Sequence, residues 1–316
     1  MFISKKTING KPRHYLEQSI RMLDGNVKKI SIYIKDYKNK NIEEYKEKLS
    51  RKLEETYIDY SINFYKKNNI FEESLLKKIE ENKLGYKKII KNITKNQLKD
   101  IIDRFAVNFT YESNAIEGNS LTLKDVTFVI QENKIPSGKD LREVYETLNT
   151  KEALELIFEN KLRITEPDII KLHKILVKNT GIKEGYKEFP NYLIGRNVKT
   201  TPPEKVKTEV KKLINWYNKS KNIHPLEKAA IFHGRFEKIH PFDDGNGRVG
   251  RLLANMILLK EGYPGLIIRK SQRIAYFSSL EAFDNGHETK LKRFFIEKFK
   301  NTYDKFFMVY IKYLKN

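Results

Sequence analysis

Twelve consecutive residues, His240–Arg251 (HPFDDGNGRVGR), constrain this chain more than any other segment. They combine an imidazole, two adjacent carboxylates, a turn framed by glycines and two guanidinium groups, and an apolar run, Leu252–Leu259, follows at once. Gly245 and Gly247 flank an asparagine, so the turn tolerates left-handed backbone and can direct successive N–H groups to one point. The apolar run predicts a helix that begins at this turn, where unpaired N–H groups and the helix dipole favour an anion. We therefore expect a phosphate-binding loop that leads into a buried helix.

The charged side chains of this segment suit a polyphosphate. Arg248 and Arg251 are three residues apart in the first helical turn, so they share a face, and guanidinium groups match phosphate oxygens bidentately. Asp243 and Asp244 are adjacent and diverge; one of them can face the anion and hold Mg²⁺, although their spacing does not say which. His240, with an ordinary pKa of about 6.5, is a competent general base at cellular pH.

The composition of the chain narrows the classes of function. The sequence has 316 residues and no cysteine, which excludes disulfides, thiolate catalysis and cysteine-based zinc sites. No apolar run approaches the ~20 residues of a membrane helix, and the N-terminus lacks the apolar segment of a signal peptide. We therefore expect a cytoplasmic protein without a membrane partner.

The net charge of +21 results from 62 Lys and Arg against 41 Asp and Glu. An excess of this size is typical of proteins that bind nucleic acid. Here, however, the lysines are spread along the expected helices and mixed with glutamates, without a block of like charges. We therefore do not expect nucleic acid to be the principal partner.

The hydrophobic pattern predicts a mainly α fold preceded by a small antiparallel sheet. Residues 1–40 contain two hairpin signals, Asn9-Gly10 and Asp24-Gly25, and a β-branched alternation between 27 and 34. Residues 41–97 form a helical N-terminal region, 98–295 the core, and 296–316 a C-terminal helix. An irregular stretch at 181–201 is expected to form a β-hairpin. Core helices are expected from 98 to about 117, from about 123, and at 140–160, 166–178, 203–218, 225–238 and 246–260.

The string His-Pro-Phe-x-Asp-Gly-Asn-Gly-Arg-x-x-Arg resembles the signature of the Fic domain at every defined position, and the resemblance covers roughly residues 98–295. It implies a Fic-type helical core that transfers AMP from ATP to a Ser, Thr or Tyr hydroxyl of a protein, the chain itself included. It also implies that His240 is the base and Asp244 the Mg²⁺ ligand, while Asp243 occupies a variable position. The implied phosphate-binding residues are Gly245, Asn246, Gly247, Arg248 and Arg251.

Upstream of the core, Ser113–Gly118 resembles the inhibitory pattern of this family, Ser/Thr-x-x-x-Glu-Gly/Asn. The resemblance implies that Glu117 pairs with Arg251 and prevents productive binding of ATP, as in the class whose inhibitory helix precedes the core (class II). Ser113 and Gly118 complete the pattern. We therefore predict a salt bridge between Glu117 and Arg251 and an autoinhibited adenylyltransferase.

Two further segments resemble parts of the same domain. Residues 181–201 resemble the flap that binds an extended target segment by strand addition, with Lys187 where family members commonly carry Arg. Residues 273–286 resemble the segment beside the nucleotide base, where Tyr276 and Phe277 are the candidates.

Three alternative functions stay open: removal of AMP, transfer from another nucleotide, and a basic nucleic-acid-binding module with a vestigial Fic core. The long Lys- and Glu-rich helices also leave a homodimer open.

Overall fold

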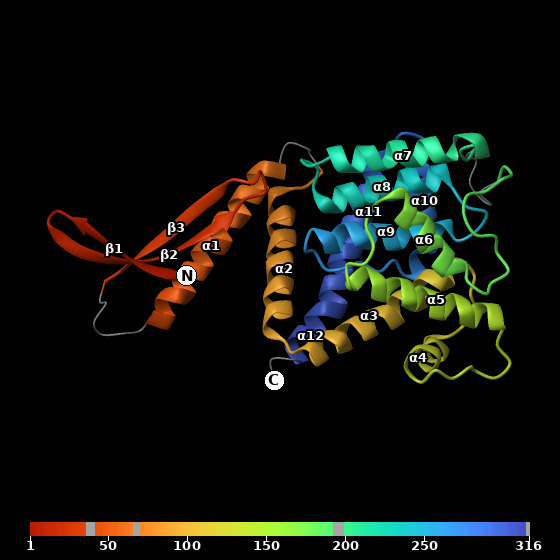
Figure 1. The fold of residues 1–316 in the computed structure, drawn as a ribbon, viewed down its shortest axis with the longest axis horizontal. Helices are drawn as coiled ribbons and strands as arrows, with labels where there is room; N and C mark the ends of the chain where they lie inside the picture. Colours follow the sequence, from red (N-terminus) through yellow and green to blue (C-terminus); the bar gives the residue numbers. More distant parts are fainter. Residues whose placement is uncertain (36–41, 66–69, 192–198, 314–316) are drawn as a thin grey trace. The chain divides into compact units, whose positions relative to one another are not determined.

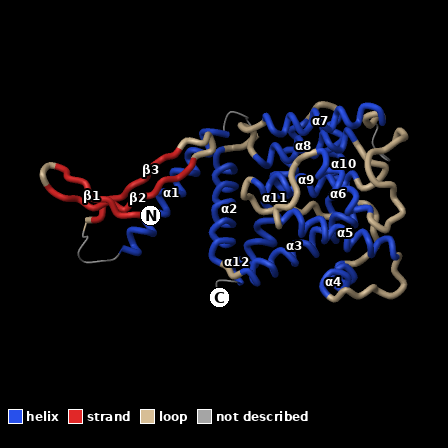
Figure 2. The backbone as a smooth tube through the Cα atoms, viewed as in Figure 1, coloured by secondary structure: helices blue, strands red, loops and turns tan. Residues whose placement is uncertain are grey.

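The structure is a computed structural model that describes residues 1–35, 42–65, 70–191 and 199–313. The chain divides into two compact units, Met1–Leu84 and Gly85–Asn316. Figure 1 shows the order of the elements and Figure 2 separates helix, strand and loop. The finer division expected from the sequence, with boundaries at 40, 97 and 295, stays a prediction.

The first unit contains the small antiparallel sheet that the sequence predicts. Its strands are β1 (Phe2–Ile8), β2 (Lys11–Arg21) and β3 (Val27–Ile34), paired in the order β1-β2-β3. Asn9 and Gly10 adopt φ values of 53° and 74° in the first hairpin, which explains why an Asn-Gly pair turns the chain there. The helix α1 (Ile42–Tyr65) covers the sheet, because its leucines pack with buried residues of β2 and β3.

The second unit is helical, as expected from the pattern of apolar residues. The helix α2 (Glu73–Asn92) begins before the division between the units and ends after it. The helices that follow are α3 (Lys95–Ile116), α4 (Leu123–Gln131), α5 (Leu141–Phe158), α6 (Glu166–Val177), α7 (Pro203–Lys219), α8 (Pro225–Ile239), α9 (Asn246–Lys260), α10 (Arg273–Asp284), α11 (Glu288–Thr302) and α12 (Met308–Tyr313).

Capping residues explain several of these boundaries. Thr94 and Gln97 form a reciprocal capping box, so α3 begins at Lys95, three residues before the expected start. Thr122 and Asp125 form the capping box that the sequence predicts for α4. Gly262, with a φ of 77°, follows the end of α9 and allows the chain to turn back.

The centre of the second unit is the pair α8 and α9, which pack against each other and are surrounded by α3, α5, α6, α7, α10 and α11. Small residues permit this close packing. A side chain at Gly234 would collide with the ring of Phe283, and one at Gly250 would lie 2.8 Å from His233 Nδ1. The loop that joins α8 to α9 contains His240–Gly245, so the core packing fixes both ends of the predicted motif.

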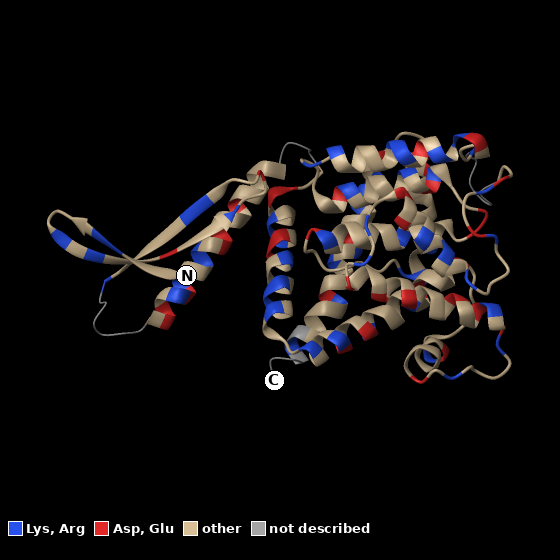
Figure 3. Ribbon diagram, in the orientation of Figure 1, with Lys and Arg blue, Asp and Glu red and all other residues tan. Residues whose placement is uncertain are grey.

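Three sequence-based expectations concern the charge distribution, membrane-spanning helices and the flap. Lys and Arg are mixed with Asp and Glu over most of the described helices in Figure 3. Within the described residues, no helix has both the length and the apolar character needed to cross a bilayer. The expected β-hairpin of the flap falls largely on residues 192–198, outside the described residues, and the described flanks at 181–191 and 199–201 are mostly irregular.

Candidate active site

The loop between α8 and α9 is held in a tight conformation by its own side chains. His240 ends α8 with a left-handed φ of 49°, and Gly245 precedes α9 with a φ of 79°. The Asn246 side chain accepts a hydrogen bond from the Phe242 N–H at 2.9 Å and donates one to the Phe242 carbonyl at 2.8 Å. Asn246 is buried, so its side chain closes the loop and only its backbone N–H remains to contact an anion.

The first turn of α9 begins at the glycine turn, and anion binding there stays a prediction. The N–H groups of Asn246, Gly247 and Arg248 lie before the first intrahelical bond, which runs from Val249 N to the Gly245 carbonyl. A Cβ atom at Gly247 would overlap the carboxylate of Glu117, which shows how closely that carboxylate lies against this turn. A carboxylate of the same chain therefore lies against the turn that we expect to bind phosphate.

The predicted ion pair between Glu117 and Arg251 is present. Arg251 Nη2 lies 2.7 Å from Glu117 Oε1, and the guanidinium also donates to the Ser113 hydroxyl at 3.0 Å and to the Ser113 carbonyl at 2.9 Å. The Arg251 side chain is 2% exposed, whereas that of Glu117 is 36% exposed. Burial alone would lower the pKa of Arg251, but the Glu117 carboxylate outweighs it and the pKa is raised. Glu117 is the C-terminal cap of α3, and Gly118 follows it with a φ of 107°.

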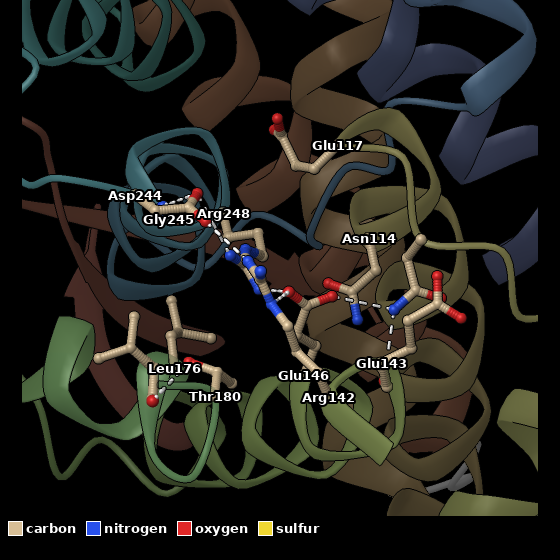
Figure 4. Close-up of polar contacts among 12 residues, drawn as sticks. Asn114, Glu117, Arg142, Glu143, Glu146, Leu176, Thr180, Asp244, Gly245 and Arg248 are labelled. Atoms are coloured by element: carbon tan, nitrogen blue, oxygen red, sulfur yellow. Dashed lines mark hydrogen bonds and ion pairs between the residues drawn. The ribbon is translucent and has the colours of Figure 1, made fainter. Parts of the chain in front are cut away.

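The other predicted phosphate-binding arginine also faces carboxylates (Figure 4). Arg248 Nη1 lies 3.1 Å from Glu146 Oε1 on α5, and Nη2 lies 3.6 Å from Asp244 Oδ1. Arg142, one turn before Glu146, donates from Nη2 to Asp244 Oδ2 at 3.0 Å. Sequence reasoning missed both α5 residues. Their i, i+4 spacing shows that they share a helix face, but nothing local connects them to a loop about a hundred residues later.

The candidate base has one ring nitrogen engaged by its own helix. His240 Nδ1 lies 3.3 Å from the Glu237 carbonyl, and the Glu237 carboxylate lies 3.9 Å from the same nitrogen. A neutral imidazole in this setting carries its proton on Nδ1, which places the lone pair on Nε2 at the opposite edge of the ring. The His240 side chain is 16% exposed.

The two aspartates are both exposed and differ in their contacts. Asp244 accepts from Arg142 and from the Gly245 N–H, whereas Asp243 interacts electrostatically with Lys187. The described residues contain no cluster of three acidic or imidazole groups that would hold a metal alone. A single carboxylate fits Mg²⁺, which commonly takes one or two protein carboxylates together with phosphate oxygens and water.

A buried histidine supports the loop from beneath. The His173 ring stacks on Phe242 with centroids 3.8 Å apart, and Nε2 lies 3.1 Å from the Asp244 carbonyl. Nδ1 accepts from the Gly185 N–H at 3.3 Å, so Nε2 is the donor. Burial lowers the pKa of His173 to about 4, which keeps the ring neutral. The sequence places this residue in the core region without indicating that it contacts the loop.

Lys187 connects the described start of the flap to the motif. Its N–H donates to the Pro241 carbonyl at 3.0 Å, and Nζ donates to Asn191 at 2.6 Å and Thr200 at 3.0 Å. Asn191 in turn donates to the Phe242 carbonyl at 2.9 Å. Burial lowers the pKa of Lys187 to about 8. These contacts stabilise the base of the flap, and Lys187 is buried there.

The two aromatic candidates for base binding lie in different surroundings. Tyr276 is 1% exposed, its hydroxyl lies 2.7 Å from His233 Nε2, and Arg251 lies over its ring at 5.9 Å. Tyr276 therefore supports Arg251 from the core. Phe277 is half-buried and packs against the Arg273 guanidinium at 4.7 Å. A contact of either ring with a nucleotide base stays a prediction.

The sequence of the chain is similar to that of known proteins. The family model described as "Fic/DOC family" matches residues 163–258. The chain is 31% identical over 186 residues to the protein adenylyltransferase fic-1 of Caenorhabditis elegans, covering 56% of this chain and 36% of that protein. It is 34% identical over 200 residues to the protein adenylyltransferase Fic of Drosophila virilis, covering 61% and 41%. The chain thus spans about two fifths of the length of these relatives.

Solved structures show the same fold. A Fic-domain-containing signalling protein of Bacteroides thetaiotaomicron superposes with a TM-score of 0.65 at 26% identity, covering 72% of this chain and 94% of that one. A fragment of Fic-1 from Caenorhabditis elegans gives a TM-score of 0.65 at 24% identity, covering 76% and 72%. With the motif loop and the arginines of α9 in place, the match of residues 163–258 identifies that part of the chain as a domain of the Fic/DOC family.

Proposed function

We propose that this domain is a protein adenylyltransferase that transfers AMP from ATP to a Ser, Thr or Tyr hydroxyl, and that Glu117 holds it inactive. The relatives that the chain matches are named protein adenylyltransferases. The observation that carries the proposal is the position of the Glu117 carboxylate. It pairs with Arg251 and lies against Gly247, at the turn where a helix N-terminus attracts an anion.

The polyphosphate would bind along the first turn of α9. The N–H groups that precede the first intrahelical bond of this turn, with Arg248 and Arg251 on the same face, would supply hydrogen-bond donors and positive charge for several phosphate oxygens. Asp244 would hold Mg²⁺, because it is the motif carboxylate that faces the arginines. When bound, the metal would neutralise charge on the phosphates. Asp243, which pairs with neither of these arginines among the described residues, would play no part in binding the metal.

The chemical step follows from the position of His240 beside this turn. The target hydroxyl oxygen attacks the α-phosphorus of ATP, a new P–O bond forms, and the bond to the β-phosphate oxygen breaks, which releases pyrophosphate. His240 accepts the hydroxyl proton on Nε2, since Nδ1 faces the Glu237 carbonyl. The flap, tied to the motif loop through Lys187 and Asn191, would position the target segment.

Inhibition in this scheme is competition between two anions. Glu117 neutralises Arg251 in the nucleotide-free state, so a phosphate must displace a carboxylate that is already hydrogen-bonded to a buried cation. Replacing Glu117 by Gly would remove the competitor. It would leave Arg251 bonded to Ser113, in the position shown by the structure.

The test is mass spectrometry of the Glu117→Gly protein after incubation with ATP and Mg²⁺. The expected product carries one or more adenylyl groups on Ser, Thr or Tyr of the chain or of an added target, and the wild type carries far less. Parallel incubations with GTP, CTP and UTP would establish the donor. His240→Ala in the same background should lose the modification. Full modification by that double variant, or none by Glu117→Gly with any donor and target, would contradict the proposal.

A further inference from the structure

Four charged side chains form a closed ring at the motif (Figure 4). Arg142 Nη2 lies 3.0 Å from Asp244 Oδ2, and Asp244 Oδ1 lies 3.6 Å from Arg248 Nη2. Arg248 Nη1 lies 3.1 Å from Glu146 Oε1, which lies 3.5 Å from Arg142 Nε. Cations and carboxylates therefore alternate around the ring, and each charge contacts two of opposite sign.

The ring has a buried side and an exposed side. The side chains of Arg248 and Glu146 are 3% and 11% exposed, whereas those of Arg142 and Asp244 are 49% and 50% exposed. Breaking a buried pair is costly because it leaves an uncompensated charge, while an exposed pair contributes little. The pair that can open at the lowest cost is therefore the exposed one, Arg142–Asp244.

Glu146 is also fixed from the side away from the ring. Its Oε2 accepts a hydrogen bond from Asn119 Nδ2 at 3.0 Å, and that amide donates to the Glu143 carbonyl at 3.3 Å. Asn119 accepts from the Leu121 N–H through its own Oδ1 at 3.0 Å. The orientation of the Glu146 carboxylate is thus set by protein contacts on α5 and on the segment after Glu117. It does not depend on a ligand.

Building on the proposed function, we propose that Glu146 is a positioning residue that retains both arginines when Asp244 turns to Mg²⁺. A metal at Asp244 must replace the contacts from Arg142 and Arg248. Glu146 remains in contact with both guanidiniums, so neither is left without a counter-ion and Arg248 stays on the face of α9 where a phosphate would bind.

Without the Glu146 charge, Asp244 becomes the only carboxylate of the ring. Both guanidiniums then depend on it, and Mg²⁺ must displace two cations that have no other partner in the ring. Loss of Glu146 should therefore raise the Mg²⁺ concentration needed for ATP binding. Loss of Arg142 should lower it, because Asp244 then loses its 3.0 Å cation while Glu146 still holds Arg248.

The experiment measures ATP binding by calorimetry as a function of Mg²⁺ in the Glu117→Gly background. Glu146→Gln, which keeps the shape of the side chain, should raise the half-saturating Mg²⁺ concentration about tenfold. Arg142→Gln should lower it about two- to fivefold, the scale of a half-exposed ion pair. The matched control is Glu143→Gln on the same helix, whose carboxylate accepts from Ser120 outside the ring, and it should leave the Mg²⁺ requirement unchanged.

An unchanged Mg²⁺ requirement in folded Glu146→Gln, or an equal shift in Glu143→Gln, would overturn the proposal. Thermal unfolding reports whether the buried substitution is folded. If it is not, the Arg142→Gln result decides, and a raised Mg²⁺ requirement there contradicts the ring. Absence of ATP binding by the Glu117→Gly parent itself would instead refute the proposed function, which separates the two failures.

Discussion

The ion pair between Glu117 and Arg251 gives the most direct quantitative prediction. Glu117→Gly removes the carboxylate from a contact of 2.7 Å to a guanidinium that is 2% exposed. Arg251 keeps its two hydrogen bonds to Ser113, so the variant tests the loss of a competing anion rather than the loss of the arginine.

The magnitude lies between two limits. Breaking a fully buried pair costs about 3–5 kcal/mol, and an exposed pair contributes about 0.2–1 kcal/mol. Glu117 is 36% exposed, so the contact is intermediate. A hydrogen bond to a charged group contributes about 1.5–3 kcal/mol. Because phosphate must displace this contact, its removal should strengthen ATP binding by about 10- to 150-fold.

Calorimetric titration with ATP and Mg²⁺ measures this change directly, and transfer of label from α-³²P-ATP measures its effect on activity. The matched control is Glu112→Gln, which removes a charge from the same helix. Its carboxylate accepts from the Lys270 N–H at 2.7 Å and lies 3.6 Å from Arg269, away from the motif. An affinity of Glu117→Gly within twofold of the wild type would refute the reasoning, as would an equal gain from Glu112→Gln.

Three further predictions concern histidines and a buried tyrosine. His240→Ala in the Glu117→Gly background should lower AMP transfer by about 10²- to 10⁴-fold with ATP binding retained, as label transfer and calorimetry will show. Tyr276→Phe removes a buried 2.7 Å hydrogen bond to His233 and should lower the free energy of unfolding by about 1–3 kcal/mol in urea titrations. The pKa of His173 is about 4 in the folded chain and about 6.5 in the unfolded chain, so the unfolded chain binds the proton more readily. The contribution of the neutral His173 to folding stability is therefore complete above pH 6.5 and is lost as the pH falls toward 4. Between pH 6.5 and pH 4 the His173→Gln protein should therefore lose roughly 3 kcal/mol less of its free energy of unfolding than the wild type.

Local signals allowed much of the fold and of the motif to be predicted. The capping box of Thr122 and Asp125 defines the start of α4, and Asn9-Gly10 defines the first hairpin, because each depends on neighbours in the chain. The loop at Gly245 and the arginines of α9 follow in the same way from residue types at fixed spacing. Glu117 and Arg251 lie far apart in the sequence, and only the resemblance to a known family predicted that they would pair.

The contacts that sequence reasoning missed depend on tertiary structure. Arg142 and Glu146 reach the motif because α5 packs on α9, and no pattern within α5 distinguishes this pair from a solvent-exposed i, i+4 pair. Asn246 is assigned to the anion site by its position, yet its side chain closes the loop onto Phe242. The position of Tyr276 in the sequence does not say whether its ring faces the nucleotide or the core. The structure shows that Tyr276 is buried and that Arg251 lies over its ring.

The pairing of both arginines with carboxylates follows from how deeply they are buried. Arg248 and Arg251 are each 2% exposed, and a cation buried to this degree requires a counter-ion even when no phosphate is present. Glu146 serves Arg248 from within α5, whereas Glu117 serves Arg251 from the C-terminal cap of α3. A carboxylate at a helix C-terminus opposes the dipole of its own helix, so Glu117 depends on Arg251 and on the N-terminus of α9 for its stability. Of the two counter-ions, Glu117 is therefore the one that a phosphate can displace at the lower cost, which explains why inhibition acts at Arg251.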